Sequence, residues 1–166
     1  FDKKKINLIN VKFENAIKST TSINNRKIYI NNCFEVAFKL IKKKFSNKLI
    51  NGPINKKIFL NKKYLGVTEY ISSKFKKKKT GMLIYNNKLS VSPITTHLPI
   101  RLVSKKINKK IIQEKILIIN NFYKNILKYK PNIGVTGLNP HCETILKFNE
   151  DEKIVLSAIK SIKKMG

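Results

Sequence analysis

Several features that mark common protein classes are scarce or absent in this sequence of 166 residues. No uninterrupted apolar run approaches the roughly 20 residues that a membrane-spanning helix requires, and no signal peptide is visible at the start. Cys33 and Cys142 are the only cysteines, so the sequence offers no disulfide framework and fits a reducing compartment. We therefore expect a soluble, globular protein of the cytoplasm, long enough to bury a real core.

Acidic residues are also scarce. The sequence has 9 of them and 36 basic residues, which gives a formal net charge of +27. Such a charge favours a polyanionic partner such as nucleic acid. Only Arg26 and Arg101 are arginines, however, whereas phosphate and base recognition favours the guanidinium fork. Lysine, asparagine and isoleucine dominate together, as expected from an adenine- and thymine-rich genome. We interpret most of the charge as a solvated surface.

A basic nucleic-acid-binding module is still the alternative from a different class of function. Such a module needs exposed aromatic side chains as stacking platforms among its lysines. The candidates Phe34, Phe38 and Phe122 lie instead on faces that the sequence predicts to be buried. We therefore expect neither a nucleic acid nor a membrane as partner.

Amphipathic segments alternate with short apolar runs along the chain. Helical spacing predicts three helices, at 32–45, 104–127 and 150–164. Short apolar runs predict strands at 49–50, 82–85, 89–94 and 133–136. The first helix presents an apolar face of Cys33, Val36, Ala37, Leu40 and Ile41, and the second has Ser104 as its expected N-cap.

The order of these elements indicates an α/β layered fold with a largely parallel sheet. The runs at 82–85 and 89–91 are close enough to form a local hairpin instead. Before residue 30 the pattern supports only a weak strand and a loop around Ser19 to Arg26. No internal repeat is present.

Three loops that contain a proline follow predicted strands, at 51–56 (NGPINK), 95–99 (TTHLP) and 136–143 (TGLNPHCE). Ligands of open α/β sheets bind at the carboxyl ends of the strands. The only two histidines, His97 and His141, fall in the second and third loops, where neutral imidazoles could share a divalent metal. Two ligands do not close such a site, so a third would come from elsewhere. The alternative is that each histidine only hydrogen-bonds to the backbone of its loop. Cys142, beside His141, is either another metal ligand or a small residue packed under the loop.

Four strings in these regions carry a family resemblance. NGPINK resembles a GP(I/V)NK signature, LGVTEY resembles GHTEF, TTHLP is nearly unchanged, and GLNPH precedes an acidic helix start. Their order and spacing over residues 50–152 are similar to those of the 4-hydroxythreonine-4-phosphate dehydrogenase family of pyridoxine and pyridoxal phosphate synthesis.

The resemblance implies a homodimer with a three-layer α/β/α fold like that of isocitrate and isopropylmalate dehydrogenases, and an active site at the subunit interface. It also implies a divalent cation, zinc, magnesium or cobalt, held by three histidines. Two of these correspond to His97 and His141, and the third belongs to a YHDQG-like segment that this sequence lacks. We therefore expect residues 1–166 to be one α/β region, the central part of a longer two-subdomain dehydrogenase, and inactive alone.

The implied reaction is NAD-dependent oxidation of the C3 hydroxyl of 4-phosphooxy-L-threonine, an oxidoreductase activity on a CH–OH group followed by loss of carbon dioxide. Thr68 corresponds to a substrate contact, and Lys56 is a candidate contact to an anionic group or a merely solvated lysine. Asn139 is expected to fix the loop of His141, and no residue is assigned as general base. Val67 replaces the family histidine and HCE shortens the family's HAGE. A dehydrogenase of 4-phosphorylated threonate or erythronate is therefore the alternative.

Overall fold

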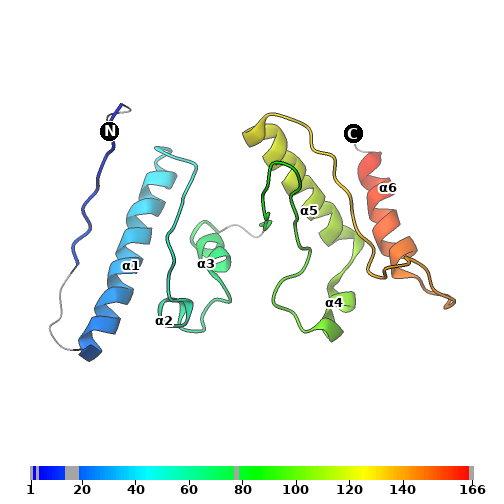
Figure 1. The fold of residues 1–166 in the computed structure, drawn as a ribbon, viewed down its shortest axis with the longest axis horizontal. Helices are drawn as coiled ribbons and strands as arrows, with labels where there is room; N and C mark the ends of the chain where they lie inside the picture. Colours follow the sequence, from blue (N-terminus) through cyan, green and yellow to red (C-terminus); the bar gives the residue numbers. More distant parts are fainter. Residues whose placement is uncertain (1, 3, 14–18, 77–78, 165–166) are drawn as a thin grey trace. The chain divides into compact units, whose positions relative to one another are not determined.

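A computed structural model of the chain describes residues 2, 4–13, 19–76 and 79–164. The chain divides into two compact units, residues 1–76 and residues 77–166 (Figure 1). None of the helices in these described ranges combines the length and the apolar character of a membrane span.

The first unit contains three helices, α1 (Ser19–Lys42), α2 (Lys56–Leu60) and α3 (Val67–Lys74). The helix predicted at 32–45 is confirmed, but α1 begins 13 residues earlier, and the loop predicted at 19–26 is wrong. That stretch has only Ile23 as an apolar residue, so hydrophobic periodicity could not reveal a helix there. The short helices α2 and α3 were not predicted, since neither is long enough to show two apolar turns.

The core of the first unit is aromatic. Phe34 stacks on Phe59 with ring centroids 5.5 Å apart, and Tyr70 packs edge-on against Phe34 at 5.4 Å. Phe38 is 1% exposed beside them. The buried stripe of α1 is thus centred on Phe34 and Phe38, whereas the predicted apolar face is only half-buried. Large rings gain more from burial than small side chains do, which decides how the helix is rotated.

The second unit contains α4 (Ile100–Lys106), α5 (Lys109–Phe122) with a π-helical end η1 (Tyr123–Leu127), and η2 (Asp151–Leu156) continuing into α6 (Ser157–Lys163). The helix predicted at 150–164 is confirmed. The one predicted at 104–127 is interrupted at Ile107 and Asn108. Asn108 accepts a hydrogen bond from the backbone nitrogen of Ile111 at 3.0 Å. The N-cap is therefore Asn108, and the assignment to Ser104 is wrong because Ser104 lies inside α4.

The core of the second unit lies between α5 and α6, which run side by side (Figure 1). Ile107, Ile112, Val155 and Ala158 are its buried members. The face predicted for 104–127 ends earlier than expected, because Phe122 is 37% exposed and Ile126 44%. A π-helical turn holds more residues than an α-helical turn, so four-residue spacing no longer keeps Ile126 on the face that α5 buries.

Paired strands are nearly absent from the described ranges. Ile84 and Val91 form one antiparallel bridge, with N–H to O=C distances of 2.8 and 3.0 Å, which confirms the local hairpin. The runs at 49–50 and 133–136 form no strand. An extended segment becomes a strand only when a neighbour completes its hydrogen bonds. The described residues supply no such neighbour, so the sheet of the predicted three-layer α/β/α fold is not seen in them.

Candidate active site

Two predicted site residues lie in the first unit, at the starts of short helices. Lys56 is the first residue of α2, where the side chain of Asn55 accepts a hydrogen bond from the backbone nitrogen of Ile58 at 3.2 Å. Thr68 is the second residue of α3. Both side chains are exposed, and no ion pair to Lys56 is present among the described residues. Lys56 and Thr68 therefore present a free ammonium group and a hydroxyl to solvent.

His97 lies in the second unit, in the loop that leads into α4. Its φ of 57° is in the left-handed region, which few residues other than glycine adopt. Two residues later Pro99 is the N-cap of α4, and its ring fixes the backbone at the end of the loop. The His97 side chain is exposed.

His141 lies in a loop that Asp151, at the start of η2, holds with its carboxylate. Asp151 Oδ1 accepts a hydrogen bond from the backbone nitrogen of Leu138 at 2.8 Å, and Oδ2 accepts one from that of Asn139 at 3.3 Å. Asp151 is the only buried charged residue among those described, with 9% exposed. In the sequence this residue is only part of an acidic helix start, and its contact with the loop was not predicted.

Asn139 holds the same loop from within. Its Oδ1 accepts a hydrogen bond from the backbone nitrogen of His141 at 3.0 Å, and its Nδ2 donates one to the carbonyl of Glu143 at 2.9 Å. The side chain of Asn149 donates to the carbonyl of Cys142 at 3.2 Å. The backbone on both sides of His141 is thus tied by side-chain hydrogen bonds, while the histidine itself is exposed.

Gly137 is needed where this loop begins. A Cβ at that position would overlap Cys142 Sγ and would lie 3.0 Å from the carbonyl oxygen of Asn139. Gly134, three residues earlier, has open space around the same position. Cys142 therefore packs against the loop backbone, which agrees with its interpretation as a small packed residue, although its residue as a whole is exposed.

The two histidines meet part of what a divalent metal needs. Imidazole nitrogens are common ligands of such metals, and none of the described residues forms a hydrogen bond with either ring. The part of the chain that the structure describes has no group of three or more histidine, cysteine or acidic residues that could hold a metal. Both exposed imidazoles are thus of a type that binds divalent metals, and the described residues contain no complete metal site.

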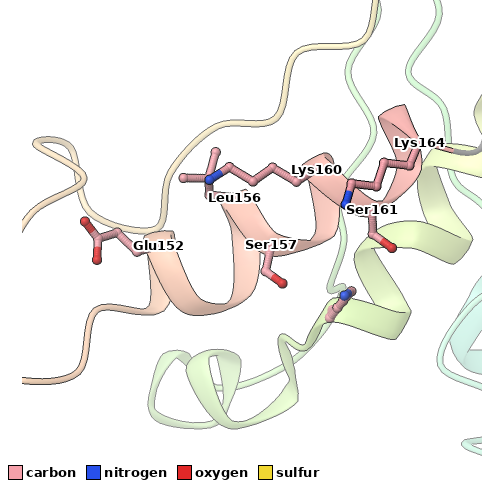
Figure 2. Close-up of a pocket in the computed structure, with 7 residues that line it drawn as sticks. Glu152, Leu156, Ser157, Lys160, Ser161 and Lys164 are labelled. Atoms are coloured by element: carbon pink, nitrogen blue, oxygen red, sulfur yellow. The ribbon is translucent and has the colours of Figure 1, made fainter.

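Two open pockets lie in the second unit. One, of about 350 Å³, borders the His141 loop and is lined by residues of α4, of the loop and of the start of η2, among them Ser104, Asn139, Glu143 and Asp151. The other, of about 390 Å³, is lined by Lys109 of α5 and by residues of η2 and α6 that Figure 2 labels. Apart from Glu152 in the acidic helix start, this second pocket contains no motif residue, and we assign it no part in the chemistry.

A family model described as pyridoxal phosphate biosynthetic protein PdxA matches residues 2–166. The chain belongs to this family. The 4-hydroxythreonine-4-phosphate dehydrogenase of Wigglesworthia glossinidia brevipalpis is 34% identical over 167 residues, which cover 98% of this chain and 50% of that protein. The resemblance seen in the four motifs is thereby confirmed.

Solved structures and a second activity also occur among the relatives of this PdxA-family chain. The crystal structure of 4-hydroxythreonine-4-phosphate dehydrogenase from Klebsiella pneumoniae aligns with a TM-score of 0.75 and 26% identity, over 86% of this chain and 45% of that one. The D-threonate 4-phosphate dehydrogenase of Pectobacterium atrosepticum is 27% identical over 80% of this chain and 44% of its own length. Over the aligned part the chain thus shares its backbone fold with the Klebsiella enzyme, and it spans about half the length of its relatives.

Proposed function

We propose that the complete protein is a 4-hydroxythreonine-4-phosphate dehydrogenase, an oxidoreductase that acts with NAD in the synthesis of pyridoxal phosphate. The observation that carries the proposal is the family match over residues 2–166, with a relative of that activity 34% identical. In the proposed reaction a hydride leaves C3 of 4-phosphooxy-L-threonine for NAD while the C3 hydroxyl loses its proton. The amino keto acid that results then loses carbon dioxide. We propose the cytoplasm as its location, since both cysteines are free thiols.

His97 and His141 are the proposed ligands of a divalent cation, zinc, magnesium or cobalt, with a third ligand from the rest of the complete protein. When bound, such a cation supplies Lewis-acid polarisation of the substrate hydroxyl and a template for its orientation. Asn139 holds the backbone of His141 through its 3.0 Å hydrogen bond. A ligand that is already ordered loses less conformational entropy on binding, so this bond favours coordination.

Thr68 and Lys56 are the proposed contacts of the first unit with anionic ligands. The exposed hydroxyl of Thr68 lies in the first turn of α3, where it can donate a hydrogen bond to the phosphorylated substrate. The exposed ammonium group of Lys56 has no acidic partner among the described residues and can attract a substrate or cofactor phosphate. No described residue is assigned as general base.

The architecture of the complete protein is part of the same proposal. We propose that it is a homodimer of two-subdomain α/β/α chains with the active site at the subunit interface. The extended runs at 49–50 and 133–136 would then pair with strands contributed by the rest of the chain. This pairing would supply the sheet neighbours that the described residues lack.

The decisive experiment compares the complete protein with residues 1–166 alone. NADH formation is followed at 340 nm with 4-phosphooxy-L-threonine, NAD and added Zn²⁺, Mg²⁺ or Co²⁺. We expect metal-dependent turnover by the complete protein and none by the shorter chain, which has two of the three proposed metal ligands. An absence of turnover in the complete protein with every metal would refute the proposal. Equal turnover by residues 1–166 would refute the assigned ligand set.

A related activity on 4-phosphorylated threonate or erythronate is the second candidate. It is favoured by Val67, which replaces the histidine of the family motif at the start of α3, and by the relative that acts on D-threonate 4-phosphate. Measuring kcat/KM for the amino and non-amino substrates side by side distinguishes the two. A ratio in favour of the threonate would replace the first candidate with the second.

The nucleic-acid-binding alternative has less support. Phe34 and Phe38 are 6% and 1% exposed, so they offer no stacking surface to bases. Phe122, which was predicted to be buried, is partly exposed and is the one of the three still accessible. A steep loss of nucleic-acid affinity with rising salt would support this alternative.

A further inference from the structure

Asp151 makes the contact that carries one further inference. A carboxylate is seldom buried without partners, and both oxygens of Asp151 accept backbone hydrogen bonds from the loop at Leu138 and Asn139. Only Pro140 separates these two residues from His141 in the sequence. The carboxylate therefore fixes the stretch of backbone that leads into the histidine.

The helix that carries Asp151 is itself tied to the far side of the loop. Asn149 Oδ1 accepts hydrogen bonds from the backbone nitrogens of Asp151 and Glu152 at 2.9 and 3.3 Å. The Nδ2 of the same side chain donates to the carbonyl of Cys142 at 3.2 Å. The start of η2 thus contacts the loop both before and after His141, which leaves the backbone between those contacts little freedom to move.

We infer that Asp151 is a positioning residue that orders the His141 loop for metal binding. The inference rests on the proposed function, because it assumes that His141 is a ligand. Replacing the Asp151 side chain with the methyl group of alanine leaves two backbone donors without partners and frees the loop. Partners that orient metal ligands typically change metal affinity by about 10- to 100-fold when they are removed.

The test uses the complete protein in four forms: wild type, Asp151→Ala, Asp151→Asn and Glu152→Gln. Glu152 is the matched control, since it is the neighbouring carboxylate of the same helix, is exposed, and makes no side-chain hydrogen bond or ion pair to any described residue. Co²⁺ affinity is measured by titration without substrate, and amide hydrogen exchange is measured over residues 137–143. Asp151→Asn keeps one acceptor oxygen, so it serves if Asp151→Ala fails to fold.

We expect Co²⁺ affinity to fall about 10- to 100-fold in Asp151→Ala and by less in Asp151→Asn. Exchange over 137–143 should rise in the same order, and Glu152→Gln should match the wild type. Wild-type affinity in both Asp151 variants would overturn the inference, as would an equal loss in Glu152→Gln. Whether the wild type binds Co²⁺ and reduces NAD tests the proposed function separately. If it binds no metal, the proposed ligand set and the metal-positioning role both fail, even if exchange shows that Asp151 orders the loop.

Discussion

Lys74 Nζ of α3 lies 2.6 Å from Glu35 Oε1 of α1, and this ion pair joins two helices through residues that are 39 positions apart in sequence. The hydrogen bond from Lys74 lowers the pKa of Glu35, and Glu35 raises the pKa of Lys74. The Lys74 and Glu35 side chains are 36% and 45% exposed, so solvent screens much of their attraction.

Replacing Glu35 with glutamine should therefore destabilise the protein only slightly, by about 0.2–1 kcal/mol at neutral pH. A lowered carboxylate pKa stabilises the fold above the ordinary pKa of glutamate, and this contribution disappears as the pH falls through the lowered value. A raised lysine pKa stabilises it below the ordinary pKa of lysine, and this contribution disappears as the pH rises through the raised value. Thermal unfolding of Glu35→Gln, Lys74→Gln and the double variant is measured from a pH below the pKa of Glu35 to a pH above that of Lys74, and it gives the coupling between the two side chains. Strictly additive losses at neutral pH would show that the pair is not coupled.

Replacing His97 or His141 with alanine should remove most divalent-metal binding and turnover from the complete protein. Both side chains are exposed on loops, so the free energy of unfolding should change by no more than about 0.5 kcal/mol. Metal content after dialysis and NADH formation are the measurements. Lys147→Ala, an exposed substitution in the same region, should leave both unchanged. Normal metal content in either histidine variant would contradict its assignment as a ligand.

Replacing Gly137 with alanine should disturb the His141 loop. The new Cβ would overlap Cys142 Sγ and press on the carbonyl oxygen of Asn139, so these parts of the loop must move apart. We expect weaker Co²⁺ binding and faster amide exchange over residues 137–143. Gly134→Ala is the matched control, because no heavy atom lies within 4 Å of the position that its Cβ would occupy. If the two variants behave alike, the close packing at Gly137 has no functional consequence.

Replacing Phe38 with alanine should destabilise the first unit strongly. Phe38 is 1% exposed and packs against Phe34, Tyr70 and Phe75, so the change opens a cavity at a typical cost of about 3–5 kcal/mol. Ile28→Ala on the same helix removes a side chain that is 57% exposed and should change stability by about 0.5 kcal/mol or less. Urea unfolding followed by circular dichroism measures both. A similar midpoint for the two variants would contradict the aromatic core.

Prediction from the sequence was most reliable where a single segment contains its own signal. The helix at 150–164 and the hairpin joining Ile84 to Val91 were predicted because apolar spacing and turn residues are local. The family was recognised from four short strings, three of them in loops, because loops that bind ligands retain specific residues for chemical reasons. Prediction was wrong at Ser104 and at the loop of residues 19–26, where two alternatives satisfy the same local pattern.

The sequence by itself determined which residues are candidates: two histidines in loops that contain proline, a lysine-rich surface, and amphipathic helices. It could not determine which side chains meet, because that depends on backbone packing between distant segments. Only the tertiary structure assigned the burial of Asp151 and its two hydrogen bonds to the His141 loop. The same holds for the partners of Phe34 and Phe38, whose burial the sequence predicted, since rings from α2 and α3 complete that core. Hydrogen bonding and burial depend on which residues lie close together in space, and the partners here lie more than ten positions apart in the sequence.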